Sequence, residues 1–285
     1  MTLDRRLHAF RPDLADVSLR DQVKAERYVE PALFQCLRGC LPLLEEPHLN
    51  AKQVSQIRYG EFLDVFEQRD DGLAWIQNRT DRYVGYIPAE GALGDKVAML
   101  SNRVAALRTF IYPEPDIKSP PVDELTLGSY ASITKQIGKF LELANGGYVF
   151  SDHVMATEYT VMSDYAFTAG RLLHTPYLWG GRTPKGIDCS GLVQLALEMA
   201  GIDSPRDSDQ QRLAFGKSLE SHWRDRPWHR GDIVFFEGHV GIMADIDHII
   251  HANAHTMDVT VEPLVDLVLR GNEIIAVASV EDLTY

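Results

Sequence analysis

Residues 186–201 read GIDCSGLVQLALEMAG, and this stretch decides how the last part of the chain folds. The run Leu192–Ala200 is apolar and free of helix breakers, so it predicts a buried helix that Gly201 can cap. Asp188 suits the N-cap position, which places Cys189 in the first turn. There the free backbone N–H groups and the helix dipole favour a thiolate and can hold an oxyanion.

Residues 230–253, RGDIVFFEGHVGIMADIDHIIHAN, contain the candidate bases for this cysteine. The pattern predicts three antiparallel strands, with His239 at the start of one strand and His251 near the end of the next. His239 could then take the thiol proton while His251 orients its other ring nitrogen, a role for which His248 and His255 compete. These histidines lack a carboxylate partner in a clear zinc motif, so we expect no metal and no cofactor.

Composition restricts the partners of the 285-residue chain. It is 45% hydrophobic and 24% charged, which indicates a globular protein, and its length suggests about two domains. A net charge of −13 argues against a nucleic-acid or anionic-membrane surface. The sequence shows no secretory signal and no membrane-spanning stretch, and its three cysteines fit a reducing compartment, so we expect a cytoplasmic protein.

The pattern of apolar, polar and turn-forming residues changes along the chain. The first residues look helical and end at two prolines, with Cys36 and Cys40 on one helix face as packing residues. Short alternating runs around the turn at 70–72 then predict a small barrel, and a weaker repeat of the pattern predicts a second one. We divide the chain into a helical arm and linker (1–47), a first barrel (48–95), a second barrel (96–155) and the domain with the candidate site (156–285).

The motifs of the last domain resemble those of the NlpC-type peptidases, which are papain-like cell-wall hydrolases. The resemblance covers essentially all of residues 160–285. Its motifs are Tyr-x-Trp-Gly-Gly, Asp-Cys-Ser-Gly-Leu-Val, Arg-Gly-Asp-Ile-Val-Phe-Phe and Gly-His-Val-Gly-Ile. The resemblance implies that Cys189 and His239 form a catalytic dyad, that His251 orients His239, and that Tyr177 lies beside the nucleophile as a positioning or oxyanion donor.

Residues 48–95 resemble a bacterial SH3-like domain, through the segments 59–61 (YGE), 72–76 (GLAWI) and 83–88 (YVGYIP). The two resemblances together imply an α+β chain: two SH3-like β-barrels followed by a papain-like domain, in which the helix with Cys189 packs on an antiparallel sheet. Small barrels of this type either bind a ligand or only brace the catalytic domain, and the sequence leaves both open.

This domain combination looks like that of the γ-D-glutamyl-L-diamino acid endopeptidases. Such enzymes cut the murein stem peptide between D-Glu and the diamino acid, and some require a free N-terminal L-Ala. The implied substrate-binding residues are Trp179, Asp188, Ser190, Arg206, Asp207 and Ser208, with Glu61 of the first barrel at the free amine and Tyr83 as its aromatic partner. Carboxylates in a partly desolvated pocket bind an ammonium group best, and Glu61 and Asp207 could supply them.

We therefore expect a monomeric cysteine endopeptidase that cleaves L-Ala-γ-D-Glu-diamino acid peptides in cell-wall peptide recycling, with no nucleic-acid or membrane partner. One alternative is an amidase or acyltransferase with a non-murein substrate, and another is an inactive protein that binds cell-wall fragments. Several site residues also have structural alternatives. Asp188 could serve only as an N-cap, Trp179 as a core aromatic, Arg206 as a loop cation and Glu61 as an exposed carboxylate.

Overall fold

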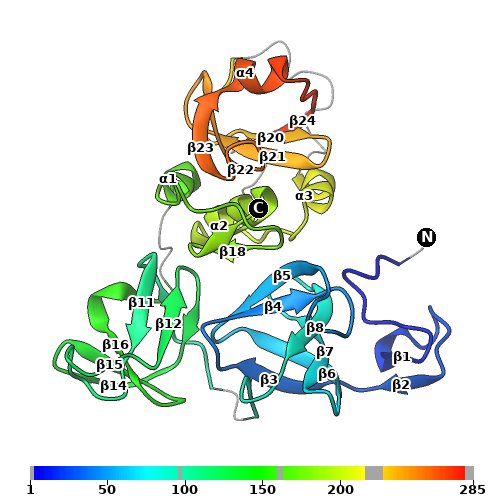
Figure 1. Cartoon of the computed structure of the whole chain (residues 1–285), viewed down its shortest axis with the longest axis vertical. Coiled ribbons are helices and arrows are strands. Elements are labelled where there is room, and N and C mark those ends of the chain that lie inside the picture. Colours follow the sequence, from blue (N-terminus) through cyan, green and yellow to red (C-terminus); the bar gives the residue numbers. More distant parts are fainter. Residues whose placement is uncertain (1–2, 96–97, 159–162, 216–226, 280–285) are drawn as a thin grey trace. The chain divides into compact units, whose positions relative to one another are not determined.

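Residues 1–157 and 158–285 form two structural units. The computed structural model describes residues 3–95, 98–158, 163–215 and 227–279. Figure 1 shows that the described part of the first unit is built mainly of strands, whereas the second combines helices with sheets. No helix within these described ranges is long and apolar enough to cross a membrane.

The first unit contains a seven-stranded sheet in the order β5-β4-β8-β7-β6-β3-β9, in which all neighbouring strands are antiparallel. The strands are β3 (Ala32–Cys36), β4 (Cys40–Leu44), β5 (Gln53–Arg58), β6 (Phe62–Gln68), β7 (Leu73–Asn78), β8 (Val84–Pro88) and β9 (Leu93–Gly94). Leu43, Ile57, Leu63 and Ile76 are buried together in its core. Alternating side chains of successive strands fill such a core, as expected for the SH3-like domain.

The expected helical arm over residues 1–47 is wrong. The segment contains β1 (Leu14–Asp16), the short 3-10 helix η1 (Val17–Leu19) and β2 (Arg27–Val29), and it ends with β3 and β4 of the barrel. Cys36 ends β3 and Cys40 begins β4, so the two cysteines share no helix face. Pairing with neighbouring strands outweighs local helix propensity here, because it buries Leu41 and Leu43 in the barrel core.

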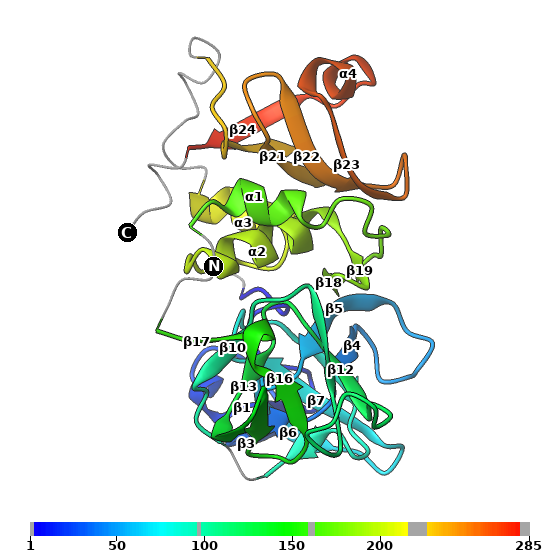
Figure 2. The same ribbon diagram turned by 90° about the vertical axis from the view of Figure 1, so that its left-hand side faces the viewer.

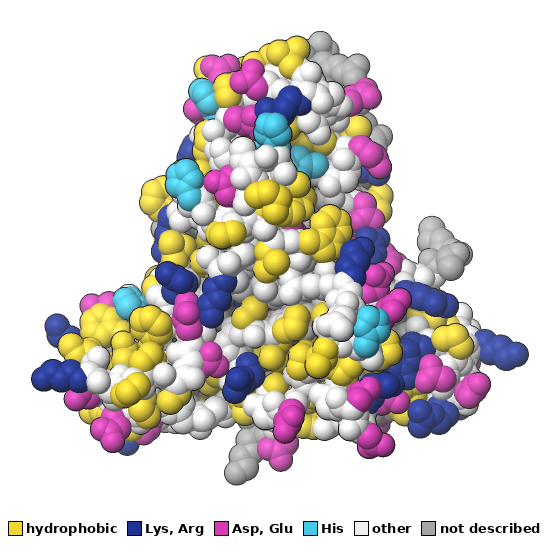
Figure 3. Space-filling model, viewed as in Figure 1, with side chains coloured by type: hydrophobic (Ala, Val, Ile, Leu, Met, Phe, Trp, Pro, Cys, Tyr) yellow, Lys and Arg dark blue, Asp and Glu magenta, His cyan; other side chains and the backbone are white. Residues whose placement is uncertain are grey.

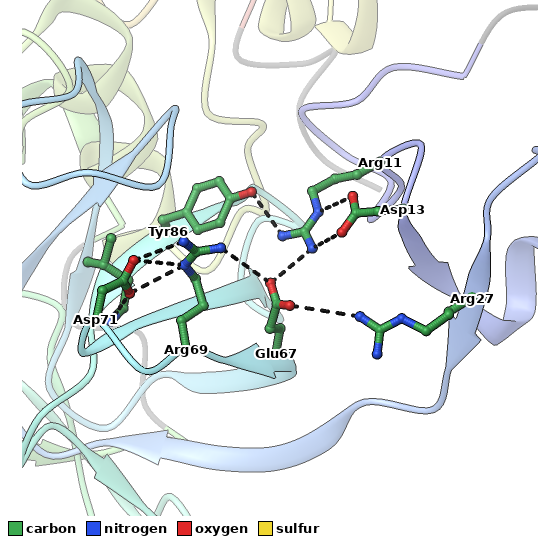
Figure 4. Close-up of polar contacts among 8 residues, drawn as sticks. Arg11, Asp13, Arg27, Glu67, Arg69, Asp71 and Tyr86 are labelled. Carbon is green, nitrogen blue, oxygen red and sulfur yellow. Dashed lines mark hydrogen bonds and ion pairs between the residues drawn. The ribbon is translucent and has the colours of Figure 1, made fainter.

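Arg11 connects the segment before β3 to the barrel through hydrogen bonds and ion pairs, as Figure 4 shows. Its guanidinium lies over the ring of Trp75, 4.3 Å from the centroid, and donates to the hydroxyl of Tyr86 at 2.9 Å. It also pairs with Glu67 at 2.9 Å and with Asp13 at 2.7 Å. A planar, weakly hydrated cation can stack and form ion pairs at once, so this one side chain joins the segment to the three strands β6, β7 and β8.

The following strands form three small sheets, in the orders β13-β10-β17, β11-β12 and β14-β15-β16. The elements are β10 (Asn102–Val104), β11 (Arg108–Ile111), β12 (Asp123–Thr126), β13 (Tyr130–Ala131), β14 (Ile133–Ile137), β15 (Phe140–Leu143), β16 (Tyr148–Phe150), the 3-10 helix η2 (Ser151–His153) and β17 (Val154–Ala156). They surround a core that includes Val104, Leu125 and Val149. This part is all β, but a second SH3-like barrel is not confirmed, and its expected start at residue 96 lies outside the described residues.

In the described part of the second unit, α1, α2 and α3 lie on one face of an antiparallel sheet and α4 lies on the other (Figures 1 and 2). The sheet has the order β23-β22-β21-β20-β24. Its strands are β20 (Ile233–Phe236), β21 (His239–Met243), β22 (His248–Asn253), β23 (Asp258–Pro263) and β24 (Ile274–Ala278). The other elements are α1 (Tyr165–Gly170), β18 (Arg182–Thr183), β19 (Gly186–Ile187), α2 (Cys189–Met199), α3 (Ser208–Phe215) and α4 (Leu264–Leu269). Every residue of α2 is buried, so the expected buried helix is confirmed.

Candidate active site

The candidate nucleophile is placed by the cap of α2. One oxygen of Asp188 accepts a hydrogen bond from the backbone N–H of Gly191 at 2.7 Å, and the other accepts from Gly180 at 2.8 Å. The first contact is the expected N-cap, and it puts Cys189 at the first helical position. A Cβ on Gly191 would lie 2.2 Å from the carbonyl oxygen of Gly181, so only glycine lets the loop approach the helix this closely.

Burial favours the neutral thiol form of Cys189. Only 8% of its surface is exposed, and this burial raises the pKa of the thiol to about 12, with the charge of Asp188 adding to the rise. The backbone N–H groups of Val240 and Ser190 reach the sulfur and lower the pKa by less. Desolvation thus acts against the nearby dipoles, and the thiolate expected at the helix start stays a prediction.

His239 and His251 meet as the meander predicts. Nε2 of His239 lies 2.8 Å from Nδ1 of His251. The sulfur of Cys189 accepts a hydrogen bond from the backbone N–H of Val240, the residue directly after His239. His251 is fully buried, whereas His248 pairs with Asp245 at the surface. The tertiary structure thus selects His251 over His248 and the exposed His255 as the partner of His239.

Both histidines are neutral at pH 7. Burial, together with the proximity of His251, lowers the pKa of His239 to about 3. Burial also lowers the pKa of His251, although Glu262 acts in the opposite direction. A neutral imidazole beside a neutral thiol is a general base in its proton-accepting form.

Tyr177 lies at the same site. Its backbone bridges to Ile187, directly before the Asp188 cap, and its side chain is half-buried. Burial raises the pKa of its hydroxyl, and the proximity of Cys189 and Asp188 adds to the rise. The phenol therefore keeps its proton and can donate a hydrogen bond near the sulfur.

Asp188, Ser190 and Arg206 form one buried network. Arg206 is 1% exposed, and its guanidinium binds both oxygens of Asp188, at 3.0 and 2.6 Å. The same guanidinium donates to the hydroxyl of Ser190 at 2.9 Å. Arg206 is therefore no solvated loop cation. The pair holds the cap of the nucleophile's helix in a defined position.

The other expected substrate residues of this unit are more open. Trp179 is 57% exposed, so it is not a core aromatic. Asp207 and Ser208 are half-buried, and Ser208 begins α3, directly after Arg206. Roles in substrate binding for these three residues stay predictions.

Glu61 and Tyr83 belong to the first unit and are both buried in the barrel. The carboxylate of Glu61 accepts from the backbone N–H and the guanidinium of Arg58, at 2.8 and 3.0 Å, and from the amide of Asn78 at 3.3 Å. Glu61 is 0% exposed, which excludes the alternative of a solvated surface carboxylate. Tyr83 packs in the barrel core. Roles in substrate binding for the two residues stay predictions.

A hollow lies on the strands that follow the barrel. A cavity of about 260 Å³ is lined by Thr109, Phe110, Tyr112, Ile117, Phe140, Phe150 and His153. Hydrophobic side chains gather over these strands at the lower left of Figure 3, and Ile117 is 71% exposed.

Among the residues that the structure describes, no group of three or more His, Cys, Asp or Glu side chains is placed to hold a metal ion.

Sequence reasoning missed Glu262 and Arg270, which continue the hydrogen bonds of His251. The signal was the alternation of valines with polar residues over 259–262, which is typical of a strand with one polar face. Register then decides the contact. Because His251 pairs with Thr260 and Ile249 with Glu262, the carboxylate lies diagonally across from His251 on the same face.

Fold and site define a papain-like cysteine peptidase with an SH3-like domain before it. The model of the NlpC/P60 family matches residues 174–269, and that of the bacterial dipeptidyl-peptidase Sh3 domain matches residues 43–91. A dipeptidyl-peptidase 6 from Lysinibacillus sphaericus is 30% identical over 245 residues, which cover 78% of this chain and 88% of that protein. The chain belongs to the NlpC/P60 family.

Two further similarities agree with this assignment. A bifunctional muramidase/DL-endopeptidase from Bacillus subtilis is 39% identical over 87 residues, which cover 27% of this chain and 25% of that protein. The crystal structure of an NlpC/P60 family protein from Bacillus cereus superimposes with a TM-score of 0.71 at 18% identity, covering 88% of this chain and all of that one. The structural match supports the fold, and the resemblance inferred from the motifs is confirmed.

Proposed function

We propose that this chain is a cysteine endopeptidase that hydrolyses the γ-D-glutamyl–diamino acid bond of murein stem peptides and prefers a free N-terminal L-Ala. The observation that carries the proposal is that Cys189, at the start of α2, contacts the backbone N–H of Val240, directly after His239, whose ring lies 2.8 Å from His251. The names of two relatives support the bond and the product, one a DL-endopeptidase and the other a dipeptidyl-peptidase. Removing L-Ala-D-Glu from such a stem releases a dipeptide.

The mechanism starts from a neutral thiol and a neutral imidazole. As the sulfur of Cys189 attacks the γ-glutamyl carbonyl carbon, the thiol proton passes to His239. Backbone N–H groups at the start of α2 and the hydroxyl of Tyr177 can stabilise the oxyanion. Collapse of the tetrahedral intermediate breaks the C–N bond, and His239 returns the proton to the leaving amine. Water then attacks the thioester with His239 as base, releasing the carboxylate and the thiol.

Recognition of the free amine is the finer part of the proposal. Asp207, half-buried directly after the buried Arg206, supplies a carboxylate within the catalytic unit. Glu61 is paired with Arg58 inside the barrel. If Glu61 binds the substrate amine, it must do so while it stays in this ion pair. We further propose that the protein acts as a cytoplasmic monomer in the recycling of cell-wall peptides.

Mass spectrometry of two incubations tests the bond and the amine separately. The substrates are L-Ala-γ-D-Glu-meso-diaminopimelate and its N-acetylated form. Release of L-Ala-D-Glu from the free-amine peptide alone is the expected result. Equal cleavage of both peptides would keep the endopeptidase and remove amine recognition. Turnover of an ester or acyl-amide, with neither peptide cut, would point to a different acyl substrate, and binding of a peptide without turnover would point to a binding protein.

Variants connect the turnover to the site. Cys189→Ala and His239→Ala are expected to keep the fold, followed by circular dichroism, and to lose measurable cleavage, because each removes a reacting group. Cys40→Ala is the matched control, since it removes a thiol of the first unit. Retained cleavage in either site variant would contradict the mechanism.

A further inference from the structure

The hydrogen bonds of the candidate triad continue beyond His251. Nε2 of His251 lies 2.8 Å from Oε1 of Glu262, on the neighbouring strand β23. Oε2 of Glu262 in turn accepts from Arg270 at 2.7 Å, and a second nitrogen of the same guanidinium binds Oε1. Arg270 stands at the C-terminal end of α4. An unbroken line of contacts thus runs from His239 through His251 and Glu262 to Arg270.

The direction of each of these hydrogen bonds follows from the negative charge of Glu262. The Arg270 guanidinium, with help from His251, holds the pKa of the Glu262 carboxyl below its usual range, so this group is an anion that only accepts. Nε2 of His251 must therefore carry a hydrogen. Because His251 is neutral, its Nδ1 has none and accepts from Nε2–H of His239. The neutral ring of His239 is then left with a lone pair on Nδ1.

We propose that Glu262, clamped by Arg270, is a positioning residue that sets the tautomers of both histidines and makes Nδ1 of His239 the base for Cys189. The inference rests on the catalytic roles under the proposed function but not on the identity of the substrate. Glu262 touches no reacting atom; it acts on the dyad only through His251.

Charge supports the same role during the reaction. When His239 takes the thiol proton, its ring becomes a cation whose Nε2–H still donates to His251. The negative charge of Glu262 lies one neutral ring away, and it favours the protonated form of His239. A relay with an anion at its end stabilises such a cation without transferring a proton to the carboxylate. The guanidinium of Arg270 keeps that carboxylate in place.

The test compares Glu262→Gln with a matched control. A glutamine can offer its NH₂ group to Nε2 of His251, which reverses both tautomers and puts the hydrogen of His239 on Nδ1, facing the thiol. Asp245→Asn removes the carboxylate of another carboxylate–imidazole pair in the same unit, because Asp245 accepts from His248 at 3.0 Å on the surface. We expect Glu262→Gln to lower kcat for the tripeptide by about 10- to 100-fold at nearly unchanged KM, and Asp245→Asn to leave both unchanged.

Two further measurements do not depend on the substrate. The rate of alkylation of Cys189 by iodoacetamide at pH 7 should fall with kcat in Glu262→Gln and recover partly in Glu262→Asp. Nitrogen-15 NMR of labelled histidines should show Nε2–H tautomers for His239 and His251 in the wild type and a shift toward Nδ1–H in Glu262→Gln. A change in stability alone would move neither the tautomer signals nor the alkylation rate of the folded protein.

The outcomes separate this inference from the proposed function. Unchanged alkylation and unchanged tautomers in Glu262→Gln would overturn the role of Glu262, whatever the peptide assay shows. A loss of alkylation together with the tautomer shift would support that role even if the wild type cleaved no murein peptide. Should Glu262→Gln fail to fold, Arg270→Gln keeps the carboxylate but removes its clamp. We then expect a smaller loss of alkylation, about 2- to 10-fold, and no loss would overturn the proposal.

Discussion

Replacing Asp188 by asparagine removes one negative charge from the cap of α2 and little else. Asparagine caps helices about as well as aspartate, so the contact to the backbone N–H of Gly191 can persist. The side chain that loses its counter-ion is Arg206, which is 1% exposed and binds both oxygens of Asp188. The perturbation therefore isolates the buried ion pair from the capping interaction.

The expected loss follows from the burial of Arg206. Leaving one partner of a buried ion pair uncompensated costs about 3–5 kcal/mol in the free energy of unfolding. The catalytic unit spans residues 158–285. At about 2.1 cal/mol/K per residue, its unfolding entropy is about 0.27 kcal/mol/K, so the loss corresponds to a fall in Tm of about 11–19 °C.

Asp164→Asn is the matched control. Asp164 also caps a helix, accepting from the backbone N–H of Phe167 at 2.9 Å, and it also pairs with an arginine, Arg230 at 3.0 Å. The side chains of this pair are 49% and 45% exposed, so its loss should cost less than about 1 kcal/mol. Urea and thermal unfolding, followed by circular dichroism, measure both variants. Equal losses in the two variants would refute the reasoning, as would an Arg206→Met change that rescues nothing in the Asp188→Asn background.

Three further predictions concern protonation and close packing. With the pKa of His239 lowered to about 3 and that of Cys189 raised to about 12, neither group titrates in between, so alkylation of Cys189 by iodoacetamide should be level from about pH 5 to 9. In His239→Ala the alkylation rate should instead rise about tenfold per pH unit as the thiolate forms. A step in the alkylation rate of the wild type near pH 6–7 would contradict a neutral thiol beside a neutral imidazole. Gly191→Ala should cost about 1–3 kcal/mol in urea unfolding, because its Cβ would lie 2.2 Å from a backbone oxygen, and unchanged stability would show that the loop can move away. Gly60→Ala should destabilise the first unit by at least about 1 kcal/mol, because Gly60 has a φ of +82° and a Cβ there would lie 2.3 Å from the carbonyl oxygen of Tyr130. Gly72→Ala is the control, because φ is also +82° there but no atom lies within 4 Å of the added Cβ. An equally small loss of stability in both variants would contradict the close approach at Gly60.

Several features followed from short stretches of sequence because they depend on local physics. The apolar run after Cys189 could only be a buried helix, and Asp188 could cap it without any help from the rest of the chain. The antiparallel meander over 230–253 brought His239 and His251 together because its turns are short and successive strands pair with each other.

Other features were decided only by tertiary structure, because they depend on contacts between distant segments. Residues 32–44 resemble a helix locally, yet pairing with β6, β5 and β8 makes them strands. The pKa of Cys189 is raised because the folded unit excludes water from the thiol, an effect that opposes the helix start visible in the sequence. Glu262 reaches His251 only through the register of β22 and β23, which a single sequence does not reveal because sliding one strand by one residue would turn the carboxylate to the other face.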